Sequence, residues 1–317
     1  MKTILVTGAA GFIGSHLCEE LLKTEAYQVI GLDAMLDLTT PVWIKERNLA
    51  QLMQHPRFQF VTHNLLTVLW EQLLPDVDIV YHLAGMPGVR SSWGDDFVHY
   101  ARHNILATQR LLEGCRRYEV ERFIFASTSS VYGEKHGRVS ETATTEPLSP
   151  YGITKLTCEH LCRVYGEDEG VPITVLRFFT VYGPRQRPDM AFHRFIRQML
   201  EKRPVTLYGD GMQSRDFTYV DDCVKAIAAC AEAKGIIGET LNIGGKERAT
   251  VQTCISLLEE LLQRKAVIQY AGGVHGEPKS TWADTWKAEQ LLSYVPTTDL
   301  KAGLAKELSY IRDLYVL

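Results

Sequence analysis

The sequence predicts an α/β fold, in which a doubly wound parallel sheet is followed by a smaller C-terminal lobe that binds substrate. Three observations support this prediction. Short apolar segments alternate with segments of helical spacing along the first half of the chain. These apolar segments contain few polar residues, as expected for strands that helices cover on both faces. After residue 177, loops that contain Gly and Pro separate shorter elements, which indicates a second structural unit.

Six segments of the first half are predicted to be strands: Ile4–Val6, Val29–Asp33, Phe58–Thr62, Val77–Leu83, Phe123–Ser127 and Ile173–Arg177. Helices are predicted over Phe12–Lys23, Asp95–Tyr118 and Tyr151–Gly166. Alternation of strand and helix implies parallel strands with right-handed crossovers. Thr240–Ile243 is a candidate for a further strand that returns to the main sheet.

The domains are expected to be interleaved. Residues 1–178 would form the first domain, together with a return segment near residues 216–245. Residues 179–317 would form most of the second lobe, placed over the carboxyl ends of the strands.

Composition excludes several classes of protein. The 317 residues include 38 acidic and 34 basic ones, and this balance is untypical of proteins that bind nucleic acid or an anionic membrane. No apolar run reaches the length of a membrane span. Seven scattered cysteines without a Cys-x-x-Cys pair indicate buried thiols in a reducing compartment. We therefore expect a cytoplasmic protein with no metal site and with neither nucleic acid nor a membrane as partner.

Three glycines, Gly8, Gly11 and Gly14, directly follow the first predicted strand and open the first helix. Glycines at this place let the backbone turn tightly and approach a pyrophosphate at the helix N-terminus, so the sheet is predicted to be of the Rossmann type. Asp33 ends the second strand, where a carboxylate can accept both ribose hydroxyls and repel a 2′-phosphate. Because no Lys or Arg is adjacent in the sequence, NAD is favoured over NADP.

Tyr151, Lys155 and Thr128 are the candidate catalytic residues. Tyr151 and Lys155 are four residues apart in a helix that Pro150 can start, so both side chains share one face. Thr128 follows a predicted strand, at the sheet edge where ligands bind in such folds. A free tyrosine has a pKa near ~10 and is a poor base at neutral pH. An adjacent ammonium and a nicotinamide cation would both favour the phenolate, which would make Tyr151 a usable base.

At this point the chain resembles the extended short-chain dehydrogenase/reductase family, specifically its nucleotide-sugar epimerases and dehydratases. The resemblance covers essentially the whole length and includes Thr7–Gly14, His82–Gly85, Ser127–Gly133, Tyr151–Lys155, Arg177–Pro184, Gly209–Gly211, Arg215–Phe217 and Leu241–Gly244. It implies retained NAD and a nucleoside-diphosphate sugar in the second lobe. It also implies a homodimer formed through the helices at 95–118 and 151–166.

The resemblance implies roles for individual residues. Contacts to NAD are expected from Gly8, Gly11, Phe12, Ile13, Gly14, Asp33, Asn64, Leu65, Leu83, Ala84, Tyr151 and Lys155. Asn64 stands where the family usually has Asp, and its amide can still accept a bond from the adenine amine. Contacts to the UDP-sugar are expected from Ser129, Ser130, Thr180, Arg187, Arg215 and Arg90. Among these, Arg90 could equally be a surface residue.

The residues after Thr128 differ between members of the family that catalyse different reactions. The similar dehydratases and decarboxylases carry carboxylates there, whereas this chain has Ser129 and Ser130, so elimination chemistry is poorly supported. The reaction that remains is reversible oxidation at carbon 4 of the sugar, which passes through a transient 4-keto sugar and uses bound NAD. A net dehydrogenase is an alternative, which would release NADH. A non-enzymatic NAD sensor would not need Thr128, Tyr151 and Lys155 together.

The segment Arg187-Pro188-Asp189-Met190 resembles the corresponding segment of UDP-glucuronate 4-epimerases. An arginine there can hold a sugar carboxylate through a bidentate pair. The expected reaction is therefore the conversion of UDP-glucuronate to UDP-galacturonate. A 4-epimerase of neutral UDP-sugars, such as UDP-glucose or UDP-N-acetylglucosamine, is the main alternative.

Overall fold

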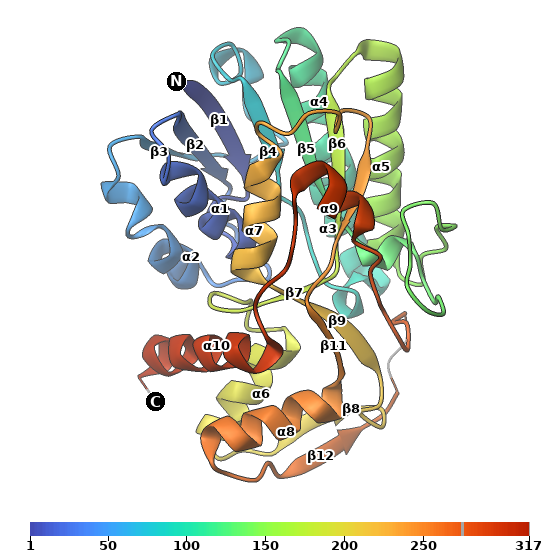
Figure 1. The fold of residues 1–317 in the computed structure, drawn as a ribbon. Coiled ribbons are helices and arrows are strands. Elements are labelled where there is room, and N and C mark those ends of the chain that lie inside the picture. Colours follow the sequence, from blue (N-terminus) through green and yellow to red (C-terminus); the bar gives the residue numbers. More distant parts are fainter. Residues whose placement is uncertain (274–275, 317) are drawn as a thin grey trace.

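A seven-stranded parallel sheet forms the centre of the molecule, as the computed structural model of the chain describes it for residues 1–273 and 276–316 (Figure 1). The spatial order of the strands is β10-β6-β5-β4-β1-β2-β3. Their bounds are β1 Lys2–Thr7, β2 Tyr27–Asp33, β3 Phe58–Thr62, β4 Ile79–His82, β5 Arg122–Thr128, β6 Ile173–Phe178 and β10 Thr240–Ile243. The prediction of a doubly wound α/β sheet is confirmed, although β4 is shorter than the predicted segment at 77–83.

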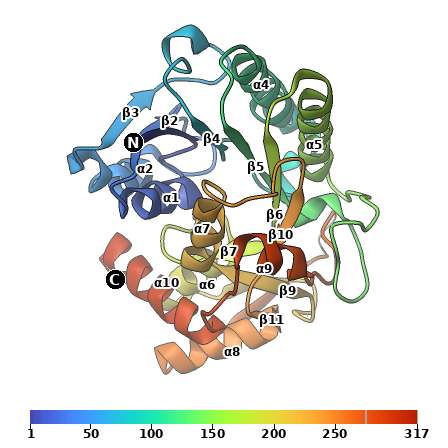
Figure 2. The same cartoon turned by 45° about the horizontal axis from the view of Figure 1, so that its top comes forward.

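Two hydrophobic cores cover the two faces of this sheet, because successive side chains of a strand point to opposite faces. In β1, Ile4 and Val6 pack in the core that includes α1 (Phe12–Leu22) and α7 (Val220–Ala229). Leu5 packs in the other core, with α4 (Ala107–Arg117) and α5 (Pro150–Glu169). Both views of the ribbon show this division (Figures 1 and 2).

The segment predicted as one helix over residues 95–118 is interrupted. It consists of α3 (Phe97–Tyr100), a π-helical turn (Ala101–Leu106) and α4. The wide turn contains the buried Asn104, whose amide bonds the backbone of Met86 and the hydroxyl of Thr154, at 2.6–3.0 Å. Such turns are frequent near functional sites, and this one ties the loop after β4 to α5.

The second lobe lies below the carboxyl edge of the sheet in Figure 1. One small sheet has the order β11-β9-β7, and β12 pairs with β8 in another. The strands are β7 Thr180–Tyr182, β8 Val205–Tyr208, β9 Ser214–Tyr219, β11 Glu247–Thr250 and β12 Ile268–Ala271. The remaining α-helices are α2 Val42–Leu49, α6 Ala191–Leu200, α8 Val251–Leu262, α9 Trp286–Leu292 and α10 Leu300–Tyr315. Short 3₁₀ turns occur at Leu52–Gln54, Trp70–Gln72, Arg90–Ser92, Gly94–Asp96 and Ser129–Val131.

The chain crosses between the two units more than once. It leaves the main sheet after β6, builds part of the lobe, and returns through α7 and β10, which pairs with β6. Most of β9 falls within the predicted return segment at 216–245, but this strand belongs to a sheet of the lobe. The exact domain boundaries stay a prediction. Among the described residues, no helix combines the length and the apolar character that a bilayer span requires.

Candidate active site

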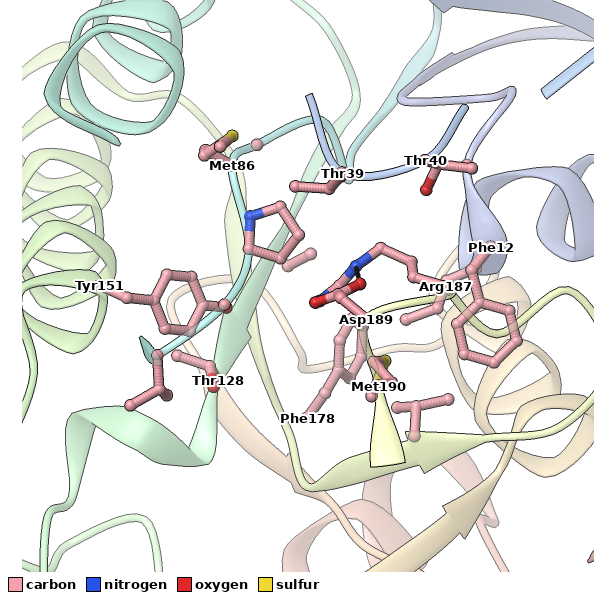
Figure 3. Close-up of a pocket in the computed structure, with 18 of the residues that line it drawn as sticks. Phe12, Thr39, Thr40, Met86, Thr128, Tyr151, Phe178, Arg187, Asp189 and Met190 are labelled. Atoms are coloured by element: carbon pink, nitrogen blue, oxygen red, sulfur yellow. Dashed lines mark hydrogen bonds and ion pairs between the residues drawn. The ribbon is translucent and has the colours of Figure 1, made fainter. Parts of the chain in front are cut away.

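A cavity of about 900 Å³ lies between the carboxyl edge of the sheet and the second lobe. All residues that the sequence singled out for catalysis, for cofactor binding and for substrate binding line this cavity. Figure 3 shows Tyr151 and Thr128 pointing into it from one side, with Arg187 and Asp189 opposite. The fold therefore brings together residues that are as far apart in the chain as Gly8 and Arg215.

The glycine loop after β1 fits a dinucleotide pyrophosphate. Gly8 has a φ of +74°, and a side-chain carbon at Gly14 would stand 2.1 Å from the Gly8 carbonyl oxygen. α1 starts at Phe12. The residue before it, Gly11, has no side chain, so no side chain of the N-cap residue occupies the N–H groups of the first turn. The N–H groups of the first turn thus face the cavity, where they can bind a phosphate group. The glycine loop, as it lies in the structure, therefore fits the pyrophosphate of NAD.

Asp33 lies at the end of β2 and is buried. Its Oδ1 accepts hydrogen bonds from the Met35 N–H at 2.8 Å and from the Lys45 ammonium at 3.0 Å. No Lys or Arg is adjacent to Asp33 in the sequence, but α2 brings Lys45 to it in the structure. Lys45 offsets part of the repulsion that Asp33 would exert on a 2′-phosphate, so Asp33 alone does not set the preference for NAD.

The N-terminus of α5 positions Tyr151 and Lys155. The Ser149 hydroxyl caps this helix by accepting a hydrogen bond from the Gly152 N–H at 3.1 Å, and Pro150 occupies the first turn. Deeper in the helix, Glu159 forms a buried ion pair with Arg177 of β6, with an Oε2–Nη2 distance of 2.6 Å. These two anchors fix the helix against the sheet edge on which Thr128 lies.

Burial raises the pKa of the Tyr151 phenol, while its hydrogen bond with Thr128 and the charge of Arg187 lower this pKa. Sequence reasoning gave the role of lowering this pKa to the Lys155 ammonium and to the nicotinamide cation. In the structure, the Lys155 ammonium lies 4.2 Å from the centre of the Phe125 ring, and burial lowers its own pKa. Arg187 is thus a cation that acts on Tyr151 in the structure, and the role of Lys155 toward the nicotinamide ribose stays a prediction.

Hydroxyl groups surround the position where a substrate hydroxyl would meet Tyr151. Thr128 ends β5, and its Oγ1 accepts a bond from the Ser130 N–H at 3.1 Å. The Ser130 hydroxyl is 3.2 Å from the same Thr128 oxygen. Ser129 and Thr180 line the same cavity. The side chains that directly follow Thr128 therefore offer hydroxyl groups rather than carboxylates to a sugar.

Arg187 forms a bidentate pair with Asp189, at 3.0 Å for both Nε–Oδ1 and Nη2–Oδ2. Sequence reasoning assigned this guanidinium fork to a sugar carboxylate and did not consider Asp189 as a partner. A substrate carboxylate must therefore displace Asp189 from the fork or approach a remaining N–H group of Arg187.

Arg90 and Arg215, the candidate diphosphate ligands, converge on one carboxylate. Arg90 Nε is 2.8 Å and Arg215 Nη2 is 3.2 Å from the Glu277 carboxylate. Burial lowers the pKa of Arg215, which is consistent with a guanidinium enclosed by the cavity wall. The structure thus brings Arg90 to the cavity, where sequence reasoning left open whether it is a surface residue.

Sequence reasoning did not find Asn104, Lys45, Asp189 or Glu277 as residues of the site. Asn104 acts through hydrogen bonds to Met86 and Thr154, and the other three act through ion pairs with predicted residues. No spacing rule identifies such pairs, because each partner comes from a different loop or helix. The Arg187–Asp189 pair is the exception, since its members are two residues apart.

The fold and this site define the class: a dinucleotide-dependent enzyme with the Tyr–Lys arrangement of the short-chain dehydrogenase/reductases. Over residues 4–244 the chain matches the NAD dependent epimerase/dehydratase family, and it belongs to that family. NAD is accordingly its cofactor, and the expectation of an extended short-chain dehydrogenase/reductase is confirmed.

Similar proteins include epimerases on both acidic and neutral sugars. An uncharacterised protein of Bacillus subtilis (strain 168), named as the UDP-glucose epimerase YtcB, is 58% identical over 98% of both chains. The structure of UDP-glucuronic acid 4-epimerase from Bacillus cereus in complex with UDP-glucuronic acid and NAD is 55% identical, with a TM-score of 0.98, over 99% of this chain and 100% of that one. MoeE5 in complex with UDP-glucose and NAD is 39% identical, with a TM-score of 0.89, over 99% of both chains.

Proposed function

We propose that the protein interconverts UDP-glucuronate and UDP-galacturonate by inverting carbon 4 of the sugar. The observation that carries this proposal is the position of Arg187, which lines the same cavity as Tyr151 and faces it from the opposite side (Figure 3). A carboxylate at carbon 6 would lie near a cation placed in this way. The similarity to the Bacillus cereus epimerase that binds UDP-glucuronic acid and NAD supports the same substrate.

In this proposal, Tyr151, Thr128 and Lys155 have different roles in the reaction at carbon 4. Tyr151 accepts the proton of the 4-hydroxyl and later returns it, while the Thr128 hydroxyl bonds the same oxygen. Lys155 binds the nicotinamide ribose. Bound NAD would supply the acceptor and donor of the hydride, a chemistry that no side chain provides. The 4-keto sugar would turn over between the loss and the return of the hydride. The hydride would then return to the opposite face of the sugar, which inverts carbon 4.

The carboxylate must be held in a particular orientation during this reaction. A uronate oxidised at carbon 4 is a β-keto acid, which loses carbon dioxide readily when its carbon–carboxylate bond stands perpendicular to the ketone plane. Arg187 and the hydroxyls of Ser129, Ser130 and Thr180 are the donors that we place around the carboxylate. Held in this way, the carboxylate stays charged and away from the reactive alignment.

Neutral UDP-sugars remain the second candidate substrates, and one observation favours them. Asp189 already occupies the fork of Arg187, which makes that pair electrically neutral. Such a pair can accept an uncharged hydroxymethyl group without leaving a lone cation. The Bacillus subtilis relative named as a UDP-glucose epimerase is consistent with this alternative.

Paired kinetics on UDP-glucuronate and UDP-glucose, followed by NMR without added cofactor, separate the two candidates. We expect Arg187→Ala to reduce turnover of the acid sugar by roughly 30- to 1000-fold more than any turnover of the neutral sugar, because a desolvated charge pair is lost. Arg215→Ala is the matched control and should weaken both substrates equally, since the diphosphate is common to them. Equal losses for Arg187→Ala would remove the main support for the uronate. Tyr151→Phe should cost about 10²-fold or more on either sugar.

We also infer that two copies associate through α3, α4 and α5. Large apolar side chains are exposed on this part of the molecule, namely Phe97, Val98, Leu106, Ile153 and Val164. A covered interface would bury them. Light scattering on the purified protein tests this inference, with a monomer as the result against it. The cytoplasmic location stays a prediction, which the seven buried, unpaired cysteines favour.

A further inference from the structure

The loop after β4, residues 86–91, forms one wall of the active cavity. Every residue of this loop lines the cavity, and Figure 3 shows Met86 on the same side of the view as Tyr151. Among the described residues, the backbone groups of residues 86–88 have no hydrogen-bond partner in another backbone group. Side chains therefore hold this wall of the cavity in place.

Two side chains hold the first half of the loop. The Asn104 amide bonds both the N–H and the carbonyl oxygen of Met86. The Tyr100 hydroxyl lies 3.0 Å from the carbonyl oxygens of both Pro87 and Gly88. A phenol has one proton to donate, so the two carbonyls share it, and the phenol oxygen can accept a hydrogen bond at the same time.

The loop turns tightly around the Tyr100 hydroxyl. The Ser91 hydroxyl oxygen lies 2.7 Å from it, so Ser91 can donate the bond that the phenol oxygen accepts. Gly88 has a φ of +110°, and a side-chain carbon there would stand 2.8 Å from Ser91 Oγ and 3.4 Å from Tyr100 Oη. Gly88 therefore permits a turn in which three groups of the loop meet one buried hydroxyl.

The ring of the same tyrosine packs against Tyr151. The two rings meet edge-on, with their centroids 6.3 Å apart and their planes at 71°. Tyr100 is fully buried and, within the part of the chain that the structure describes, it is not among the residues that line the cavity. Tyr100 can therefore act on a bound sugar only through its neighbours.

A second connection joins the loop to the start of α5. The hydroxyl oxygen of Thr154 accepts a hydrogen bond from the Asn104 amide at 2.9 Å, and this hydroxyl donates to the Tyr151 carbonyl oxygen at 2.8 Å. Tyr100 is the last residue of α3, and Asn104 lies in the π-helical turn that follows. This segment thus contacts the loop and α5 at the same time.

We propose that Tyr100 is a positioning residue of the active site: its hydroxyl fixes the loop at 86–91 and its ring fixes Tyr151, so that these two walls keep one separation. The inference rests on the proposed function in one respect, because the 4-keto sugar must turn over between these walls without leaving the cavity. A loop that moves away from Tyr151 would bind the sugar less tightly. The Tyr100 hydroxyl itself transfers no proton to the substrate, since groups of the loop surround it.

Limited proteolysis tests the hold on the loop without any turnover. Arg90 is exposed, so trypsin can cleave after it when the loop opens. In the NAD-bound protein, we expect Tyr100→Phe to raise the rate of cleavage after Arg90 by about tenfold, because the carbonyls of Pro87 and Gly88 lose their donor. Cleavage at other sites, identified by mass spectrometry, should keep its rate. An unchanged rate after Arg90, or an equal rise at every site, would overturn the proposal.

Tyr81→Phe is the matched control. Tyr81 is fully buried in β4, and its hydroxyl donates to the carbonyl oxygen of Ala228 in α7 at 3.3 Å. This variant also loses a tyrosine hydroxyl bonded to a backbone carbonyl, so it measures the effect of lost stability alone. We expect it to leave both the cleavage after Arg90 and the KM for the sugar unchanged. The same changes as in Tyr100→Phe would reduce Tyr100 to a general structural residue.

Kinetics on UDP-glucuronate and UDP-glucose separate the two contacts of Tyr100. Tyr100→Phe keeps the ring, so KM should rise by about tenfold while kcat stays near that of the wild type. Tyr100→Leu also loses the ring, and kcat should then fall by roughly two- to tenfold. A lower kcat at unchanged KM in Tyr100→Phe would place the hydroxyl in the chemical step and overturn the proposal. Turnover of neither sugar by the wild type would instead refute the proposed function, and proteolysis would still decide the role of Tyr100.

Discussion

The Tyr151 phenol is subject to opposing effects, since burial raises its pKa while Thr128 and Arg187 lower it. Removing the cation in Arg187→Ala therefore raises this pKa further. Because the phenolate is the active form, we expect the acid limb of the profile of kcat/KM against pH to move to higher pH. The measurement is a pH–rate profile on UDP-glucose, whose turnover does not depend on a carboxylate contact.

Arg187→Lys is the control for this shift. It keeps the positive charge but loses the bidentate fork, so its pH profile should stay near that of the wild type while turnover of UDP-glucuronate still falls. An unmoved profile in Arg187→Ala would show that the charge of this residue does not reach Tyr151.

The Asp33–Lys45 pair allows a prediction of how the preference for NAD over NADP can be changed. In Asp33→Ser, the carboxylate that repels a 2′-phosphate is gone and the Lys45 ammonium remains to attract one. We expect this variant to retain NADP as well as NAD after reconstitution, as measured by mass spectrometry of the released cofactor. The double variant Asp33→Ser with Lys45→Met should lose NADP again. Retention of NADP by the double variant would mean that another cation is responsible.

Among the elements, α10 supports the loop that carries Arg187. Glu307 of α10 is fully buried, and its Oε2 accepts a hydrogen bond from the Gly183 N–H at 3.0 Å. Burial raises the pKa of this carboxyl well above its ordinary value. The folded protein therefore holds a proton that the unfolded chain releases, and wild-type stability falls as the pH rises above the unfolded pKa of about 4.3.

Glu307→Gln should remove this loss, because its amide oxygen still accepts the Gly183 N–H and carries no charge. We expect the variant to gain stability relative to the wild type between pH 5 and pH 8, measured by urea unfolding. Relative to Glu307→Gln, Glu307→Ala should cost about 1–3 kcal/mol at any pH, since the buried N–H of Gly183 is left unpaired. A pH-independent difference between Gln and wild type would contradict the assignment.

Elements with a strong local pattern could be predicted from the sequence. The apolar segments of β1, β2, β3 and β5 and the start of α5 at Pro150 follow from hydrophobic runs and cap chemistry. The π-helical turn at Ala101–Leu106 could not be predicted, because it depends on contacts of Asn104 with Met86 and Thr154. Local propensity does not report such distant partners.

On the scale of the whole molecule, the position of the site followed from topology. The carboxyl ends of parallel strands meet at one edge, so Gly8, Asp33 and Thr128 had to approach each other. The charges that neutralise or occupy the predicted residues did not follow from topology. Lys45 lies on α2, Asp189 and Glu277 lie on loops, and packing sets where each of them meets its partner. Sequence thus predicted which residues line the cavity better than what they contact there.

Bound NAD should stabilise the entire molecule, since its predicted contacts come from four strand ends. Removing it is expected to lower Tm, and adding it at 100 times its Kd should restore about 2.7 kcal/mol of stability. Differential scanning calorimetry of the stripped and reloaded protein measures this. NADP at the same concentration is the control, and an equal effect of NADP would contradict the preference for NAD.

The return of β10 to the edge of β6 has a consequence for synthesis on the ribosome. When residue 178 leaves the exit tunnel, β6 has no neighbour on its outer side, and more than 60 further residues must emerge before its partner β10 does. An unpaired, apolar strand edge invites pairing with another nascent chain. The edge of β6 therefore stays open over this interval, and genetic fission after residue 178 would leave the main sheet without β10 and would leave β10 in the other half without its partner.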